Sequence, residues 1–436
     1  MKLLYILLIF FLVTSFEMGS FNVFLGDLFH NIVIATCFFL IILYFSFKIL
    51  KYGTVFNVGC LNLQEFKHFS FITLLLATFF IIHAVIIGPI ASIKYSGYLL
   101  MLFVLITQLT KKDFNKLCII YFCFMAYVSI AAFVQIILVS ISGTSIYDYV
   151  SIKLSDSAFF RAPDMVMPYF LTFASAEENA SLGPFSFVRA IGFSSEPKYF
   201  SALLWPAFAI SLSWRASKST KILLLVRTAL LLGLLIAQAY SSLLVICVSC
   251  TFYWVMRLHL VNNGIKSLII LFMPIFISLI LTVSVVIILG AIPGGGMIFA
   301  RLNSFIYSVG DFNLNTVMNF GTMGTNIASG EEIPLSGNAT MLLNWYRFGH
   351  VGFLLYLAPI FFIIYKSVSC FFYLKPNQKW GLAILLSTYV VYYQTFFSQP
   401  FTLFSCFILA SICFRAKLQS QDVERLKSSS SEGIKT

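Results

Sequence analysis

Charged side chains are scarce in this chain of 436 residues. Asp, Glu, Lys and Arg together make up 10% of it, whereas soluble domains contain about 25%. The hydrophobic share is 60%, and the mean hydropathy is +0.95. Because so little charge cannot cover a soluble surface, the composition excludes a soluble globule, a nucleic-acid-binding module and a disordered linker. It predicts an integral membrane protein.

Metal and disulfide patterns are also missing. The nine cysteines show no zinc-ligand spacing, and none lies in the two long loops defined below, so no disulfide framework is expected. Cys247 and Cys250 form a C-x-x-C pair inside an apolar run, where packing or lipid contact is a better interpretation than redox chemistry. Neither long loop contains a D-x-D pair, which argues against a metal-dependent nucleotide-sugar transferase. The sequence therefore predicts no metal and no cofactor.

Long apolar runs are what the chain has in abundance. A window of about 19 residues finds about twelve of them, so we expect an all-α, polytopic membrane protein that forms one domain over residues 1–436. The first run follows Lys2 and is also compatible with a cleaved signal peptide. The predicted spans are 3–16, 29–47, 69–88, 95–110, 117–140, 199–214, 222–238, 241–257, 268–290, 340–365, 381–397 and 400–414.

Lys and Arg are distributed unevenly between the two sides of these spans. Twenty of the 28 lie in one set of connections, which includes both termini, seven lie in the other set, and Arg227 lies within a span. Eleven of the 16 acidic residues lie on the side that is poor in Lys and Arg. Since cytoplasmic loops carry the excess of basic residues, we expect both termini in the cytoplasm. The net charge of +12 is then expected to face anionic lipid and not nucleic acid.

Two connections on the outer side are much longer than the rest, at residues 141–198 and 291–339. Both are rich in Gly, Pro, Ser and Asn and carry most of the external charge. Binding and catalytic residues concentrate in long structured loops, so we expect a site at the outer membrane surface. The cytoplasmic tail at 415–436 contains a run of serines and is expected to be disordered.

The first long loop ends in a motif of charged residues, glycine and proline: Arg189, Gly192, Glu196, Pro197 and Lys198. Glu196 and Pro197 suit the first turn of a helix, so the motif is compatible with a helix start alone. That interpretation leaves Arg189 and Gly192 unexplained. We therefore predict a functional site here.

The second long loop contains a single basic residue, Arg301, shortly after three glycines at 294–296. No P-loop Lys follows the glycines, so they are not a nucleotide-binding motif. Arg301 is also compatible with an interfacial residue that extends its charge to water. The loop closes at Asn338, and the next span contains Arg347 and His350. For His350, helix packing is an alternative to substrate binding.

These features together resemble the O-antigen polymerases (Wzy-type), within the wider group of O-antigen polymerases and ligases. The resemblance covers the topology of nearly the whole chain but only short segments of its sequence. One segment is the motif at 189–197, which has the form R-x-x-G-x-x-x-E-P. Another is the serine-containing turn between two spans that begins with Tyr240 and Ser241.

A third segment separates polymerases from ligases. Ligases resemble the pattern H-[NSQ]-x9-G-x-x-[GTY] where the second long loop meets its span. This chain has Asn338, Gly349 and Gly352 at the corresponding positions. Because Asn replaces the histidine and alanine follows it, a polymerase is favoured over a ligase.

The resemblance implies a substrate and roles for individual residues. The substrate would be an undecaprenyl-diphosphate-linked oligosaccharide at the periplasmic face of the bacterial inner membrane, polymerised into O-antigen or a related surface polysaccharide. Membrane lipids and a chain-length regulator protein would be the other partners. Arg189 and Arg301 would bind the diphosphate, and Glu196 would act as a base toward the acceptor hydroxyl. The substrate-binding candidates are Arg161, Lys198, Gly192, Asn338, Arg347, His350, Tyr240 and Ser241.

Two other functions are compatible with the sequence. A flippase for lipid-linked oligosaccharides shares the length and span count, but it does not need two large outer loops. Its spans would carry cationic residues that face a cavity, and Arg227, with Arg347 near the end of its span, answers that description. A ligase would use the same donor with a different acceptor.

Overall fold

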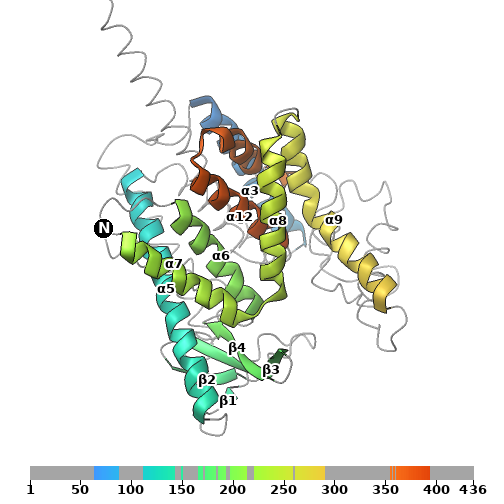
Figure 1. Ribbon diagram of the computed structural model, residues 1–436. Coiled ribbons are helices and arrows are strands. Elements are labelled where there is room, and N and C mark those ends of the chain that lie inside the picture. The colour runs from blue at the N-terminus through green and yellow to red at the C-terminus, as the bar shows by residue number, and fades with distance from the viewer. Residues whose placement is uncertain are drawn as a thin grey trace, which may run out of the picture. The chain divides into compact units, whose positions relative to one another are not determined.

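The computed structural model describes residues 63–87, 111–142, 149–150, 165–169, 172–182, 185–192, 197–213, 220–258, 261–289 and 354–392, apart from 356 and 359 (Figure 1). The chain divides into two compact units. Unit 1 comprises Met1–Val55, Thr110–Tyr253 and Leu374–Thr388, and unit 2 comprises Phe56–Leu109, Trp254–Tyr373 and Tyr389–Thr436.

The described part of the chain is mostly helical, as the sequence predicts. Each helix overlaps a predicted apolar run, and most begin a few residues before it. The predicted runs at 3–16, 29–47, 95–110 and 400–414 lie outside the described residues. The helices are α3 (Leu63–Ile87), α5 (Lys111–Ser142), α6 (Pro197–Ser213), α7 (Thr220–Ala237), α8 (Tyr240–Arg257), α9 (Asn263–Leu289), a stretch at Ile360–Tyr373 that ends in the 3-10 helix η4 (Phe371–Tyr373), and α12 (Pro376–Val391).

One stretch of helix, Cys118–Leu138 in α5, is both long and apolar enough to cross a membrane, by the length and composition of the described residues. Shorter apolar helices are Ser241–Arg257, Asn263–Pro274 and Ile360–Tyr373. A helix rises 1.5 Å per residue, so about 20 residues cover a hydrocarbon core of about 30 Å. The number of spans and their orientation stay predictions.

A four-stranded antiparallel sheet follows α5, in the strand order β1-β2-β3-β4. The all-α prediction is wrong for this part of the first long loop. Apolar windows of about 19 residues average over strands that are shorter than the window, whereas Phe185, Ser186 and Phe187 show the apolar and polar alternation that is typical of a strand. The strands are β1 (Tyr149–Val150), β2 (Met165–Tyr169), β3 (Thr172–Leu182) and β4 (Phe185–Gly192).

The sheet is anchored to α5 by a buried polar pair. Thr172, the first residue of β3, donates a hydrogen bond from Oγ1 to Oε1 of Gln135 on α5, and both residues are 0% exposed. An unpaired amide or hydroxyl at such a site is costly, so the pair holds the sheet on the helix. Nearer the start of α5, the Tyr121 hydroxyl donates a hydrogen bond to the Leu203 carbonyl at 2.7 Å and links α5 to α6.

Small residues allow the helices of unit 1 to approach one another closely. A Cβ atom added to Gly233 of α7 would collide with the Ser129 side chain of α5 and lie 3.0 Å from Leu204 of α6. A Cβ added to Gly381 of α12 would lie 2.8 Å from the Ala209 carbonyl oxygen. Close contact through small residues is common where helices pack in membranes.

Within unit 2, a lysine is buried at the start of α9. Lys266 is 1% exposed, its Nζ lies 3.5 Å from the Met256 carbonyl oxygen near the end of α8, and it lies 5.5 Å from the centre of the Phe372 ring. A cation suits both the carboxyl end of a helix and an aromatic face. Burial lowers the pKa of Lys266, and these contacts oppose that effect.

Candidate functional site

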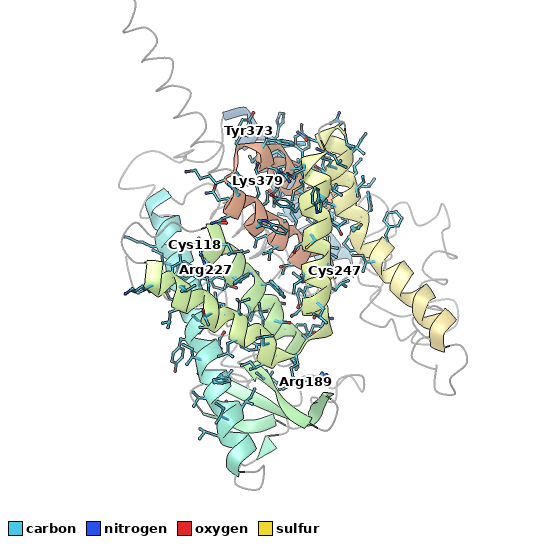
Figure 2. All side chains as sticks on the ribbon, viewed as in Figure 1. Cys118, Arg189, Arg227, Cys247, Tyr373 and Lys379 are labelled. Atoms are coloured by element: carbon cyan, nitrogen blue, oxygen red, sulfur yellow. The ribbon has the colours of Figure 1, made fainter. Side chains whose placement is uncertain are left out.

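Arg189 lies on β4, the strand that packs against α5, α6 and α7. It is paired with Ser175 of β3 and is half-buried, with its Nε atom buried. The next two residues, Ala190 and Ile191, are both 0% exposed. Figure 2 shows Arg189 on the sheet, where the sheet meets the helices. The fully packed end of β4 therefore fixes the backbone that carries this guanidinium.

Gly192 ends β4 in a conformation that favours glycine. Its φ is +66°, and an added Cβ would lie 2.5 Å from Cδ2 of Phe200 on α6. Phe200 is itself 0% exposed. The glycine is thus required for the turn of the chain from the sheet onto α6. Its contact with substrate stays a prediction.

Helix α6 begins at Pro197, a residue that suits the first helical position because its missing N–H has no partner there. Lys198 follows in the first turn and is half-buried, and its carbonyl accepts a hydrogen bond from Ser201 Oγ at 2.9 Å. The free N–H groups and the dipole at this end of a helix favour an anion. Arg189 and Lys198 precede and follow the same connection, residues 193–196.

Helix α8 begins at the same end of unit 1 as α6. Tyr240 and Ser241 are its first two residues, and the hydroxyl of the next residue, Ser242, accepts a hydrogen bond at 3.2 Å from Nε1 of Trp205 on α6. Trp205 lies about two turns from the start of α6, so α8 begins beside the first turns of α6. We call this region, defined by Arg189, Gly192, Lys198, Tyr240 and Ser241, the sheet end of unit 1.

The turn between α7 and α8 also belongs to the sheet end, since α7 packs on β4. Gln238 occupies this turn with a φ of 46° and is the one non-glycine residue with positive φ in the described part of the chain. Its backbone N–H donates to the Leu235 carbonyl at 3.2 Å. Its side-chain oxygen Oε1 is buried and has no hydrogen-bond partner. Neither the positive φ nor the buried oxygen of Gln238 has a signal in the sequence.

A bulge in β3 lies opposite Arg189. Ser175 pairs with Arg189 and Asn179 with Val188, so residues 176–178 have no partner on β4. This bulge contains two consecutive acidic residues, Glu177 and Glu178, which belong to no motif in the sequence. Bulges are frequent beside active sites. The pairing of β3 with β4 thus places an acidic segment of the backbone beside the strand that carries Arg189.

Arg227 lies in the first half of α7, away from the sheet end (Figure 2). Its Nε and Nη2 atoms donate hydrogen bonds to the Ser211 carbonyl oxygen at 3.2 and 2.6 Å. Ser211 is in the last turn of α6, where helix carbonyls have no partner within the helix. Arg227 therefore caps α6.

Large apolar side chains cover the exposed faces of α7 and the adjoining half of α8. Leu235 is 72% exposed and Leu243 is 64% exposed. Soluble proteins rarely expose contiguous apolar patches of this kind. Others on the same two helices are Ile222, Leu224, Leu225, Leu231 and Ile246.

The structure describes five of the predicted site residues: Arg189 and Gly192 on β4, Lys198 in the first turn of α6, and Tyr240 and Ser241 at the start of α8. The other predicted site residues lie outside the described part of the chain. They are Glu196, Arg301, Arg161, Asn338, Arg347 and His350. Among the described residues, no group of three or more His, Cys, Asp or Glu side chains forms a metal site.

Comparison of the chain with protein-family models, with curated proteins and with solved structures found no match.

Proposed function

We propose that this protein is a membrane glycosyltransferase that polymerises undecaprenyl-diphosphate-linked oligosaccharide repeat units. The product is O-antigen or a related surface polysaccharide, made at the periplasmic face of a bacterial inner membrane. The proposal rests on the resemblance of the chain to O-antigen polymerases and on the sheet end of unit 1.

The observation that carries the proposal is the arrangement of cationic and helix-terminal groups at the sheet end. Arg189 is held by a packed strand immediately before α6, Lys198 lies in the first turn of α6, and α8 begins nearby. Helix starts and guanidinium groups both stabilise phosphate oxygens. A diphosphate carried by a membrane lipid is a ligand that this arrangement suits.

The chemistry needs charge stabilisation more than it needs a strong acid. An acceptor sugar hydroxyl attacks the anomeric carbon of the donor glycan, and the bond from that carbon to the diphosphate breaks with its electron pair. Arg189, with Arg301 from the second long loop, stabilises the charge that develops on the leaving diphosphate. Glu196 takes the proton of the attacking hydroxyl. No metal or cofactor enters the proposal.

Membrane insertion is supported by the surface of unit 1. The exposed leucine and isoleucine side chains of α7 and α8 suit contact with lipid, and α5 contains a stretch able to cross the bilayer. The distribution of basic residues favours cytoplasmic termini, and with that orientation the sheet end, with residues 141–198, faces the periplasm.

Of the two cationic residues that the flippase alternative offers within spans, Arg227 is described by the structure and Arg347 is not. A transport cation needs to face a cavity and the passing substrate. Arg227 instead makes two hydrogen bonds to the carbonyl of Ser211. This contact favours an enzyme over a transporter.

Deleting the gene and separating the surface polysaccharide on a gel tests the proposal against both alternatives. We expect the deletion to leave lipid capped with a single repeat unit. Loss of all capping would indicate a flippase, and accumulation of lipid-linked polymer would indicate a ligase. Either of these results would overturn the proposed function.

A further inference from the structure

Two features that oppose stability coincide at Gln238, in the turn that joins α7 to α8. A side chain with a Cβ is strained at a φ of 46°, a conformation that glycine adopts freely at the end of a helix. The side-chain oxygen of the same residue is buried without a hydrogen-bond partner, although buried polar atoms are nearly always paired. A glycine at this position would remove both features.

The surroundings of Gln238 are otherwise well satisfied. Four residues further along the chain, Ser242 accepts a hydrogen bond from Trp205 and donates its backbone N–H to the Ala239 carbonyl at 2.8 Å. Ala237, the last residue of α7, is 0% exposed. The unpaired acceptor and the backbone strain are therefore confined to one side chain in a packed turn. Such outliers are concentrated at sites of function.

We propose that Gln238 binds the glycan of the lipid-linked substrate, with its amide oxygen accepting a hydrogen bond from a sugar hydroxyl. The residue is half-buried, and a sugar hydroxyl that reaches its amide oxygen supplies the hydrogen bond that this oxygen lacks within the protein. The proposal rests on the proposed function, because the sheet end is where the lipid diphosphate is expected.

An amide is suited to a sugar more than to the diphosphate. Its oxygen accepts hydrogen bonds from hydroxyl groups, which the glycan offers in number and an ionised diphosphate does not. Arg189 and Lys198 already provide the positive charge at the same end of unit 1. Different residues of the sheet end would then bind different parts of the ligand: Arg189 and Lys198 the diphosphate, and Gln238 the sugar.

The test uses the purified full-length protein and two probes: an undecaprenyl-diphosphate-linked repeat unit and undecaprenyl diphosphate without sugar. Two variants separate the features of the residue. Gln238→Gly removes the amide and relieves the backbone strain, whereas Gln238→Met removes the amide oxygen and keeps the strain. Thermal unfolding is measured alongside binding.

Both variants are expected to bind the glycan-bearing lipid about tenfold more weakly than the wild type, as the loss of one hydrogen bond predicts. Both should bind the sugar-free lipid as the wild type does. Gln238→Gly should in addition unfold at a higher temperature, so that the more stable protein is the weaker binder. A cap residue alone would give the higher unfolding temperature with unchanged binding.

Unchanged binding of the glycan-bearing lipid by both variants would overturn the role of Gln238 and leave the proposed function in place. Equal wild-type affinity for the two probes would do the same, since the sugar would then contribute nothing. A wild-type protein that binds neither probe would instead remove the proposed function.

Discussion

Two regions of α7, the first half of the helix and the turn that follows its last residue, differ in how completely their polar side chains are hydrogen-bonded. In the first half of the helix, Arg227 donates two hydrogen bonds to the Ser211 carbonyl and completes the end of α6. At the other end, Gln238 keeps a strained backbone and a buried oxygen without a partner. The contact of Arg227 thus stabilises the fold, whereas Gln238 makes the protein less stable than a glycine at the same position would.

The difference follows the distribution of the site residues. Arg189, Gly192 and Lys198 all lie at the sheet end, and the side chain of Arg227 has a structural partner. Substitutions at the sheet end should therefore lower activity with little loss of stability, and substitutions at the capped end should do the reverse. Gly192 is an exception. It lies at the sheet end, but its substitution should lower stability, because its positive φ and its contact with Phe200 are structural.

The largest effect is expected at Glu196. Gln has nearly the size of Glu but cannot act as a base. Loss of a general base lowers a rate by about a hundred- to ten-thousand-fold. The rate of polymerisation of lipid-linked repeat units by the purified variant measures this, with Glu196→Asp expected to retain more activity. Loss of activity in Glu177→Gln or Glu178→Gln, with near-normal activity in Glu196→Gln, would move the base to the bulge of β3.

Arg189→Ala is expected to lower the same rate by about a hundred- to a thousand-fold, because this is the usual cost of removing one group that stabilises charge in the transition state. Arg301→Ala should behave similarly. Lys at either position should restore little, because an ammonium cannot make the two parallel hydrogen bonds of a guanidinium. Wild-type polymer length from both Ala variants, at normal abundance in the membrane, would exclude the two arginines from the site.

Gly192→Ala tests the structural exception. The added Cβ meets both an unfavourable φ and the Phe200 ring, so we expect a loss of about 2–4 kcal/mol in the free energy of unfolding. Gly264→Ala is the matched control, since the nearest atom to its Cβ would be 3.6 Å away. Thermal unfolding in detergent measures both. Equal stability of the two variants would contradict the packing of Gly192 on Phe200.

The smallest effect is expected at the capped end. Arg227→Met leaves the Ser211 carbonyl without its donor and should lower the free energy of unfolding by about 1–3 kcal/mol, with unchanged activity per folded molecule. Lys221→Met, an exposed position on the same helix, should change neither. A variant at Arg227 that is fully stable but inactive would assign this residue to a substrate path and restore the flippase interpretation.

The helices were predictable from the sequence because apolar runs are long enough to average reliably. The described helices from α3 to α12 overlap predicted runs. Their early starts reflect polar first turns, such as that of α12, where Oε1 of Gln378 accepts the Lys375 N–H at 3.1 Å. The sheet was not predicted, because even its longest strand, the 11 residues of β3, is shorter than the apolar window and lies among residues of loop-like composition.

Among the residues of the candidate site, the charged ones have a sequence signal. Arg189 and Lys198 were recognisable from their position before and after a helix start, and the structure brings them to one end of unit 1. Gln238 could not be found in this way, since its backbone φ and the burial of its oxygen depend on how α7 meets α8. Gly192 was recognised as unusual, but its reason, the close approach of Phe200, depends on packing between β4 and α6.

The most direct test of the proposed function is polymerisation by the purified protein in liposomes supplied with undecaprenyl-diphosphate-linked repeat units. The expected product is a ladder of lipid-linked glycans that differ by one repeat unit, with one undecaprenyl diphosphate released for each linkage formed. This ladder should be absent with Glu196→Gln protein at equal abundance. Folded wild-type protein that leaves the single-unit lipid unchanged, or moves it across the bilayer without joining units, would contradict the assignment as a polymerase.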